Sequence, residues 1–254
     1  MVKIILSGCG GAMGKVVLKQ AHAREDCAVV AGIDPHDHDG GEDFPVFPTA
    51  GQCNIPADVI LDFSHPSALE GLLDLSKRTG TPLVLATTGL SEEQIQSVHR
   101  AAGQSPIFFT FNMSLGINLM CALAKAATRV LGGLYDIEII EKHHNRKIDA
   151  PSGTAIMLAN AVSGELAVNP DYIYERNSRR QKREKNEIGL HTIRGGTIVG
   201  EHEVLFAGQD ETLSIVHTAH SKEVFATGAL SAAVFMRGKP PGLYDMSNMM
   251  DSAQ

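Results

Sequence analysis

The segment from Glu141 to Thr154 is the stretch of this sequence richest in side chains that can do chemistry. It reads Glu-Lys-His-His-Asn-Arg-Lys-Ile-Asp-Ala-Pro-Ser-Gly-Thr, and five of its residues can carry a positive charge. The segment links a predicted strand to a helix that we expect to begin near Ala155. Ser152, Gly153 and Thr154 are therefore expected at the helix N-terminus, where backbone N–H groups and hydroxyls can bind a carboxylate.

Three side chains that can be cationic lie close to this turn in the sequence. His143, His144 and Lys147 can supply both positive charge and protons, so the segment predicts a site for a small dicarboxylate. We do not predict a metal site, because adjacent histidines lack the i, i+4 spacing of a helical metal pair and no cysteine is near. Taken alone, these residues are also compatible with a solvated basic loop.

A glycine-rich segment near the start of the chain predicts a second kind of site. Residues 8–14 read Gly-Cys-Gly-Gly-Ala-Met-Gly, directly after an apolar strand and at the start of a helix. The first glycine allows a tight turn, the middle ones let the backbone approach a pyrophosphate, and the last allows close packing of helix and strand. The helix N-terminus offers N–H groups to the phosphates. This pattern predicts dinucleotide binding, with a purely structural turn as the alternative.

Asp34 supports that prediction and bears on the choice of cofactor. It lies 20 residues beyond Gly14, at the end of the next predicted strand, where a carboxylate can accept both hydroxyls of a ribose. The carboxylate would repel a 2′-phosphate, and no Arg or Lys follows it through Phe44. The sequence therefore favours NADH over NADPH.

Two further predicted strand ends carry polar residues. Residues 87–89, Thr-Thr-Gly, follow one strand and precede a helix, a position that faces the ligand crevice in a doubly wound sheet. Residues 110–113 end the next strand in the same way, and Asn112 among them could orient a nicotinamide amide. An ordinary strand–loop–helix turn is the alternative interpretation of residues 87–89.

The elements that would position these residues differ between the two halves of the chain. In the first half, we expect strands at 2–6, 28–33, 59–63, 82–85 and 107–110, and helices at 13–23, 65–78 and 91–102. Such alternation predicts parallel βαβ units with right-handed crossovers. In the second half, we expect helices at 114–131, 155–165 and 226–236, and strands at 135–142, 189–194, 197–206 and 212–218.

These elements predict an α/β protein of two domains. The first is an N-terminal Rossmann-type doubly wound sheet that binds a dinucleotide, formed by residues 1–113 and 225–254. The second is an α+β domain with a mixed sheet, formed by residues 114–224. The helix at 226–236 is rich in small residues, which would let it pack against the first domain.

Composition limits the classes of protein that fit. The chain has 254 residues, 43% of them hydrophobic and 20% charged, as in an ordinary globular protein. A net charge of −7 would repel nucleic acid and anionic membranes, and an aromatic content of 5% argues against stacking platforms for single-stranded nucleic acid. No apolar run reaches the roughly 18 residues of a membrane helix, and the apolar start is too short for a signal peptide. We therefore expect no nucleic-acid or membrane partner.

Other residues that can do chemistry have plainer interpretations. The four cysteines form no C-x-x-C pair, so we interpret them as reduced thiols in a cytosolic protein. The basic run at 176–185 is expected to be a solvated loop. Four histidines in strand patterns are expected to be surface residues or residues satisfied within the fold: His191, His202, His217 and His220.

The sequence resembles the bacterial 4-hydroxy-tetrahydrodipicolinate reductases, also called dihydrodipicolinate reductases. The resemblance rests above all on Glu141-Lys142-His143-His144 with Lys147 and on residues 149–154, a highly specific combination. It extends in the expected order over nearly the whole chain, through residues 8–14, 87–89, 112–114, 188–191, 194–202 and 241–246.

The resemblance implies a cytoplasmic, NADH- or NADPH-dependent oxidoreductase of diaminopimelate and lysine biosynthesis that yields tetrahydrodipicolinate. It also implies a homotetramer, joined through the sheets of the substrate domain. His143 would be the acid/base and Lys147 the proton donor. The residues that would contact the substrate are His144, Ser152, Gly153 and Thr154. The cofactor contacts that it implies are Gly8, Cys9, Gly10, Gly11, Ala12, Met13, Asp34, Ala86, Thr87, Thr88, Thr110, Phe111, Asn112 and Met113.

Two departures from the family pattern concern the cofactor. Ala86 stands where the family commonly has Gly, and Pro35 stands where members that use NADPH readily often have Arg. Other functions remain as alternatives: a different two-domain Rossmann reductase acting on an amino acid, a sugar or a small dicarboxylate, or a dinucleotide-sensing binding protein.

Overall fold

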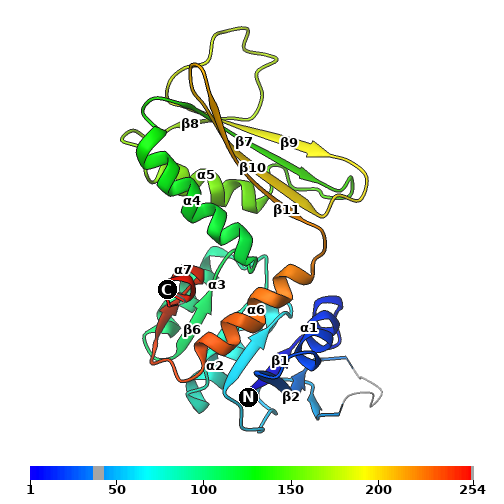
Figure 1. Ribbon diagram of the computed structural model, residues 1–254. Helices are drawn as coiled ribbons and strands as arrows, with labels where there is room; N and C mark the ends of the chain where they lie inside the picture. The colour runs from blue at the N-terminus through cyan, green and yellow to red at the C-terminus, as the bar shows by residue number, and fades with distance from the viewer. Residues whose placement is uncertain (37–42, 253–254) are drawn as a thin grey trace. The chain divides into compact units, whose positions relative to one another are not determined.

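The computed structural model describes residues 1–36 and 43–252, which form two compact units (Figure 1). The first unit consists of Met1–Ser114 and Glu223–Gln254, and the second of Leu115–Lys222. The first unit is therefore built from both ends of the chain.

The first unit contains a seven-stranded parallel sheet in the order β12-β6-β5-β4-β1-β2-β3. Its strands are β1 (Val2–Ser7), β2 (Cys27–Ile33), β3 (Val46–Phe47), β4 (Val59–Asp62), β5 (Leu83–Leu85), β6 (Pro106–Phe109) and β12 (Gly242–Tyr244). The order reverses between β1 and β4, the point at which open α/β sheets bind ligands.

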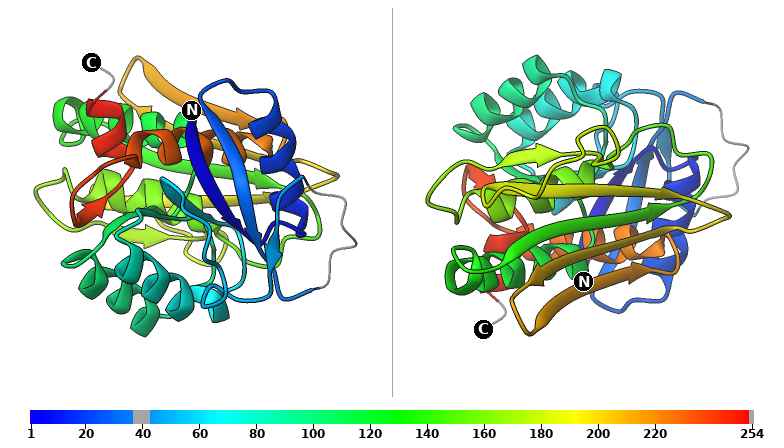
Figure 2. Two further views of the ribbon diagram at one scale, coloured as in Figure 1. Left: turned by 90° about the horizontal axis from the view of Figure 1, so that it is seen from below. Right: turned by 90° about the horizontal axis from the view of Figure 1, so that it is seen from above.

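Helices cover both faces of this sheet (Figure 2, left). The helices are α1 (Ala12–His22), α2 (Leu69–Thr79), α3 (Glu92–Ala102), α6 (Glu223–Met236) and α7 (Met246–Asp251), with a short 3₁₀ turn at Pro66–Ala68. α1 and α6 pack on one face, and α2 and α3 on the other. A Cβ at Gly228 of α6 would lie 1.8 Å from the Met113 carbonyl oxygen, so glycine is needed for this close approach.

The second unit contains a five-stranded mixed sheet in the order β11-β10-β7-β9-β8. Its strands are β7 (Asp136–His143), β8 (Asp171–Ile173), β9 (Glu187–Arg194), β10 (Gly200–Ala207) and β11 (Thr212–Ala219). The helices α4 (Leu115–Leu131) and α5 (Gly153–Ser163) pack with the buried side of the sheet in a single hydrophobic core. Buried residues alternate with partly exposed ones along β7 and β10, so each strand has one covered face and one more open face.

The predicted fold class is confirmed: a Rossmann-type parallel sheet accompanies a second, mixed sheet. The helix expected over residues 65–78 is divided into the 3₁₀ turn and α2. Four elements were not predicted: β3, β8 and β12, which span only two or three residues, and α7.

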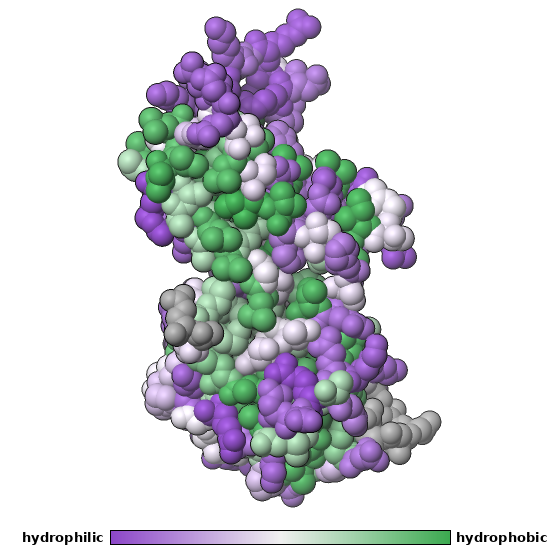
Figure 3. Space-filling view, viewed as in Figure 1, coloured by the Kyte–Doolittle hydropathy of each residue, from purple (hydrophilic) through white to green (hydrophobic). Residues whose placement is uncertain are grey.

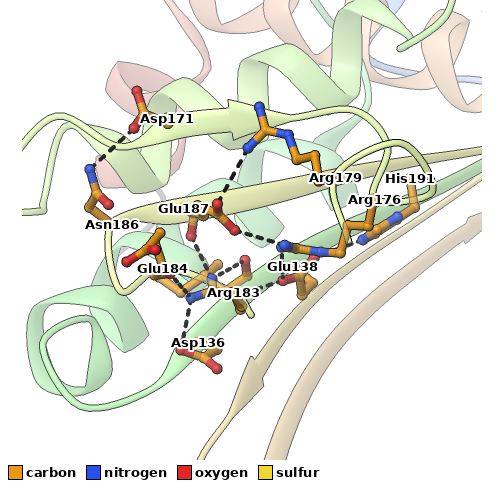
Figure 4. A network of polar contacts seen from close by, with 11 residues as sticks. Asp136, Glu138, Asp171, Arg176, Arg179, Arg183, Glu184, Asn186, Glu187 and His191 are labelled. Atoms are coloured by element: carbon orange, nitrogen blue, oxygen red, sulfur yellow. Dashed lines mark hydrogen bonds and ion pairs between the residues drawn. The ribbon is translucent and has the colours of Figure 1, made fainter. Parts of the chain in front are cut away.

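The basic segment after β8 is a largely exposed loop, as expected, but its two half-buried arginines, Arg176 and Arg183, are bound to the sheet. Arg176 and Arg183 donate to Glu138 on β7 at 3.2 and 2.9 Å, and Arg176 also donates to Glu187 on β9 at 2.7 Å (Figure 4). Gly189 makes room for this network, since a Cβ there would lie 1.7 Å from a Glu138 carboxylate oxygen. The segment is therefore attached to the sheet by ion pairs.

Helix α4 is hydrophobic on its solvent-facing side as well as on its buried side. Leu115, Leu119, Leu123 and Val130 are exposed at near-helical spacing, and Figure 3 shows hydrophobic residues gathered over this helix. Within the described residues, however, none of the helices combines the length and hydrophobicity needed to cross a membrane.

Candidate active site

The glycine-rich turn after β1 has the conformation that its sequence predicts. Gly8 has a φ of 79°, and a Cβ there would lie 2.7 Å from the Phe63 carbonyl oxygen. A Cβ at Gly14 would lie 2.1 Å from the Gly8 carbonyl oxygen, so the last glycine allows α1 to pack on its own preceding turn. Both positions therefore need glycine, for conformation and for space.

The N-terminus of α1 is suited to an anion. The cap residue is Gly11, and the described residues supply no side-chain hydrogen bond to the cap and no acidic residue in the first turn. Gly11 and Ala12 are exposed, while Cys9 below them is buried. Backbone N–H groups with the positive end of the helix dipole are the features that bind a pyrophosphate in this fold.

Asp34 lies beside this turn, at the end of β2. Its carboxylate accepts the backbone N–H of Gly10 at 3.0 Å and that of His36 at 3.1 Å. These bonds hold the side chain against the glycine-rich turn. The residues thus fit a dinucleotide, with the carboxylate next to the anion-binding helix terminus.

A buried carboxyl group organises the loop after β5. Asp62, at the end of β4, accepts the Thr87 hydroxyl at 2.6 Å, and it accepts the N–H and hydroxyl of Ser64 at 3.0 and 2.5 Å. Burial raises the pKa of Asp62, although these hydrogen bonds favour its ionised form. The Ala86 N–H donates to the Asp62 carbonyl, and Thr88 is exposed. Thr87 is therefore fixed in place by a residue that sequence reasoning did not select.

The segment after β6 forms a turn that leads to α4. The Asn112 side-chain oxygen accepts the Ser114 N–H at 2.8 Å, and the Thr110 hydroxyl donates to the Asn112 carbonyl at 3.2 Å. Phe111 is largely exposed, whereas Met113 is buried. The Asn112 oxygen thus has a local structural partner in addition to the cofactor role predicted for its side chain.

In the second unit, His143 ends β7 and is paired with a buried carboxylate on the same strand. Its Nδ1 lies 2.5 Å from a carboxylate oxygen of Glu141, two residues earlier on the same face of the sheet. An imidazole whose Nδ1–H donates to a carboxylate has its Nε2 left to exchange a proton. A Cβ at Gly200 would lie 3.2 Å from this Nε2, so glycine leaves space beside it.

Glu141 is held by several donors at once. Arg194 donates to both carboxylate oxygens at 2.8 Å, the Ser152 N–H donates at 3.1 Å and the Thr192 hydroxyl at 3.2 Å. Burial by itself would raise the pKa of Glu141, but the bonds from Arg194, His143 and Ser152 lower it to about 2. The carboxylate therefore stays charged in the interior because it has cationic and N–H partners.

His202, on β10, bonds within the fold, as one of its two expected interpretations had it, and it also belongs to the same cluster. Its ring lies edge-on to that of His143, with centroids 5.1 Å apart, and its Nε2 is 3.1 Å from the Ser152 hydroxyl. Burial, followed by the nearby charge of His143, lowers the pKa of His202 to about 4. His202 is therefore neutral at physiological pH.

The Ser-Gly-Thr turn lies at the start of α5, as predicted. The Ser152 hydroxyl accepts the Ala155 N–H at 3.2 Å and so caps the helix, while the side chain is buried against His202. Gly153 is exposed and Thr154 half-buried. The Ser152 hydroxyl is thus engaged within the protein, and the outer part of the turn faces solvent.

The remaining cations lie in the loop between β7 and α5. The Lys147 ammonium group lies 2.8 Å from the Asp149 carboxylate, and this contact lowers the pKa of Asp149. His144 is half-buried; burial, together with the positive charges of Arg146 and Lys222, lowers its pKa. The loop is therefore a concentration of positive charge with one carboxylate inside it.

The structure brings the predicted residues together in two groups. Those proposed for the cofactor lie at the carboxyl ends of β1, β2, β5 and β6, and those proposed for the substrate lie at the end of β7 and the start of α5. Among the residues that the structure describes, no cluster of three or more His, Cys, Asp or Glu side chains could hold a metal ion. Sequence reasoning did not select Glu141, Arg194, His202 and Asp62; the period of two between Glu141 and His143 was the available signal for the first.

Comparisons with known proteins agree over the whole chain. The family model described as dihydrodipicolinate reductase, N-terminus, matches residues 2–113, and the one described as dihydrodipicolinate reductase, C-terminus, matches residues 116–250. A 4-hydroxy-tetrahydrodipicolinate reductase of Caldanaerobacter subterraneus subsp. tengcongensis is 48% identical over 98% of both chains, and one of Clostridium novyi is 48% identical over 99% of both. The solved structure of a dipicolinate-bound dihydrodipicolinate reductase from Paenisporosarcina sp. TG-14 has the same fold, with a TM-score of 0.79 and 24% identity over 96% of this chain and 97% of the other.

Proposed function

We propose roles for individual residues of this chain in the reaction of the dihydrodipicolinate reductase family. The chain belongs to that family. The chain is an oxidoreductase of diaminopimelate and lysine biosynthesis, a 4-hydroxy-tetrahydrodipicolinate reductase that uses NAD(P)H. A different two-domain Rossmann reductase or a non-catalytic binding protein would leave the match of both halves to this family unexplained. The observation that carries the proposed roles is the Glu141–His143 pair beside the cationic loop that contains Lys147.

The cofactor is proposed to bind to the first unit. The uncapped N-terminus of α1 would bind its pyrophosphate, and Asp34 its ribose hydroxyls. Residues 86–88 and 110–113, at neighbouring strand ends, would contact the nicotinamide side. When bound, the reduced nicotinamide supplies a hydride.

We propose that NADH is at least as good a cofactor as NADPH. The buried Asp34 carboxylate would repel a 2′-phosphate, the next residue is Pro35, and no Arg or Lys occurs between it and Phe44. Steady-state constants for both cofactors test this proposal. A clear preference for NADPH in kcat/KM would contradict it.

The proton is proposed to come from the cationic loop of the second unit. Reduction of a C=N bond leaves negative charge that a proton must neutralise, and Lys147 is the proposed donor. His143 is the proposed acid/base, because its Nδ1 is held by Glu141 and its Nε2 is left for proton exchange.

The substrate is proposed to be a small dicarboxylate held by the same loop. Gly153 and Thr154 offer backbone and hydroxyl donors at the start of α5, and His144 adds a further donor. Because the Ser152 hydroxyl already caps α5 and contacts His202, we propose that it shapes the turn. The dipicolinate in the Paenisporosarcina reductase structure is a dicarboxylate of this kind.

Three substitutions test these roles. Lys147→Ala should lower kcat by about 10²- to 10⁴-fold, since it removes a group that acts in the transition state. His143→Ala should lower kcat and alter its pH profile, whereas Thr154→Ala should chiefly raise the KM for the dicarboxylate. NADH binding, measured by fluorescence, should be unchanged in all three. Near-normal kcat in Lys147→Ala, or a loss of NADH binding, would contradict the assignment.

We also propose a homotetramer joined through the second unit. The sheet face opposite α4 and α5 has no helix packed on it among the described residues (Figure 2, right), and Ile193 and Val216 on this face are 45% and 55% exposed. An open sheet with apolar side chains is suited to burial against a second copy. Light scattering should give a tetramer, and a stable monomer at micromolar concentration would refute this.

A cytoplasmic location completes the proposal. No disulfide joins the four described cysteines, Cys9, Cys27, Cys53 and Cys121, and three of them are buried. Reduced, buried thiols suit a reducing compartment. Fractionation of cells that make the protein would test the location.

A further inference from the structure

We infer that Arg194 is a positioning residue that fixes both proposed proton-transfer groups at once, His143 through Glu141 and Lys147 through the main chain at Asp149. This inference rests on the roles proposed above for His143 and Lys147. Arg194 lies on a different strand, β9, and the bonds that link its guanidinium to His143 and Lys147 run through Glu141 and Asp149.

Arg194 acts on His143 through a two-bonded fork with Glu141. Nη1 donates to one carboxylate oxygen and Nη2 to the other, each at 2.8 Å. This is the planar, two-bonded geometry that only a guanidinium offers to a carboxylate. Since the same carboxylate accepts the His143 Nδ1–H, the fork sets the direction in which His143 points its Nε2.

Arg194 is linked to Lys147 through Asp149. Nη2 of Arg194 also donates to the Asp149 carbonyl oxygen at 2.6 Å, and the Asp149 carboxylate lies 2.8 Å from the Lys147 ammonium group. The turn after Arg194 holds the start of the same loop, because the Gly195 N–H donates to the His143 carbonyl at 2.9 Å. The loop between β7 and α5 is therefore attached to the end of β9 at both of its ends.

One guanidinium thus sets the places of two side chains that are four residues apart in the sequence. β7 and β9 are paired in parallel with His143 opposite Arg194, so the sheet itself fixes where the fork begins. Arg194 is also mostly buried, which limits competition from water for its donors. A lysine at this position could keep the charge but could not make all three bonds in these directions.

The main test compares Arg194→Met with the wild-type enzyme across a range of pH. Misplacing the proton-transfer groups should lower kcat about 10²-fold, with a smaller change in the KM for the dicarboxylate. Without Arg194, the Glu141 carboxylate would keep only its uncharged donors, Ser152 and Thr192, beside His143, and its charge would favour the charged form of His143 more strongly. The limb of the kcat profile that depends on His143 should therefore move to higher pH.

Two further variants separate charge from geometry. Arg194→Lys should keep the His143-dependent limb near its wild-type position while kcat stays low. In Arg194→Ala, free guanidinium, well below concentrations that unfold proteins, should restore part of kcat, whereas ammonium should not. A purely structural role for Arg194 would give neither result.

A double substitution tests the link to Lys147. Arg194→Met should cause a smaller fold-decrease in kcat in a Lys147→Ala background than in the wild type. The two fold-decreases should differ by a factor of at least about three. If the two effects simply multiply, Arg194 does not act through Lys147. The matched control is Arg129→Met, which removes an exposed arginine that pairs with Glu165 at 3.1 Å in the same unit; kcat and its pH profile should be unchanged.

The outcomes distinguish this inference from the proposed function. If His143→Ala and Lys147→Ala keep wild-type kcat, the proposed roles fail and this inference fails with them. If those variants lose activity but Arg194→Met leaves kcat and its pH profile unchanged, only the inference about Arg194 is wrong. A loss of kcat with an unmoved His143-dependent limb and no rescue by guanidinium would also overturn it.

Discussion

Two carboxyl groups near strand ends, one in each unit, are equally buried, but their pKa values shift in opposite directions. Asp62 and Glu141 are both 1% exposed. Asp62 is bonded to the hydroxyls of Thr87 and Ser64 and to one backbone N–H, and burial raises its pKa. Glu141 is bonded to Arg194 and His143, and its pKa is lowered to about 2 although burial acts in the opposite direction.

The difference shows that the charge of the partner, more than the degree of burial, decides the direction in which the pKa of an interior carboxyl group shifts. In the first unit, burial with uncharged partners disfavours the ionised form of a carboxyl group near the proposed site for an anionic cofactor. In the second unit, a fully charged carboxylate holds the cations that a dicarboxylate substrate requires. Each unit thus uses a buried acid in the way that suits the charge of its proposed ligand.

The largest expected effect follows from Glu141→Gln. The glutamine amide would donate to His143 Nδ1 and place the proton of the neutral ring on Nε2, the wrong atom for accepting one; it would also face Arg194 without a charge. We expect kcat to fall about 10³-fold, within the usual range for general acid–base groups, with NADH binding unchanged.

Glu165→Gln, which removes one charge of the ion pair with the exposed Arg129 in the same unit, serves as the control and should have wild-type kcat. If Glu141→Gln is also fully active, the Glu141–His143 pair has no part in catalysis.

A smaller effect is expected in the first unit. Asp62→Ala would remove the carboxylate that accepts the Thr87 and Ser64 donors, and we expect it to raise the KM for NADH about tenfold through the displaced loop. Asp62→Asn keeps an acceptor of similar shape, so its KM should change by less than about threefold.

NADH binding, followed by stopped flow or fluorescence with the KM for the dicarboxylate measured in parallel, distinguishes Asp62→Ala from Asp62→Asn. An equal rise in the KM for NADH in both variants would mean that the charge of Asp62, and not only its hydrogen bonds, holds the loop.

The two acids should also affect stability in opposite directions of pH. For Glu141, the folded pKa of about 2 lies below the ordinary value of 4.5, so its contribution is present above pH 4.5 and is lost as the pH falls towards 2. For Asp62, the pKa is raised above 3.8, so its contribution is present below that value and is lost as the pH rises through the raised pKa.

Urea unfolding of the wild type, Glu141→Gln and Asp62→Asn from acidic to neutral pH measures how the free energy of unfolding of each protein changes with pH. Relative to wild type, Glu141→Gln should lose less stability on acidification, and Asp62→Asn should lose less as the pH rises. If the two substitutions changed the pH dependence of the free energy of unfolding in the same direction, the pKa shifts assigned to Glu141 and Asp62 would be contradicted.

The smallest effects are expected from the threonines that donate to each acid. Thr87→Val removes one of three bonds to Asp62, at 2.6 Å, and should lower the free energy of unfolding by about 1 kcal/mol. Thr192→Val removes a 3.2 Å bond to Glu141, which keeps its cationic partners, and should cost less than about 0.5 kcal/mol.

Urea unfolding at neutral pH compares these two isosteric changes directly. A larger loss in Thr192→Val than in Thr87→Val would show that the cations do not dominate the environment of Glu141.

Local patterns were enough to predict the glycine-rich turn, the long strands and the helix that begins after Ser152. Strands of two or three residues, such as β3 and β12, are too short for a periodic pattern. The Glu141–Arg194 fork joins residues 53 positions apart, and it depends on the parallel register of β7 with β9. His202 likewise reaches Ser152 only because β10 pairs with β7. Contacts that depend on strand register were therefore beyond what spacing in one sequence could show.

The construction of the first unit from both ends of the chain has a consequence for protein synthesis. α6 and β12 complete its sheet and its core, yet they lie in Glu223–Gln254, after the whole of the second unit. A nascent chain that has just reached Lys222 holds every strand of the second unit, while the first still exposes to water the apolar face that α6 will cover. Translation therefore completes the sequence of the second unit before that of the first, and the glycine-rich turn made at the outset gains its last supporting elements only at the end of synthesis.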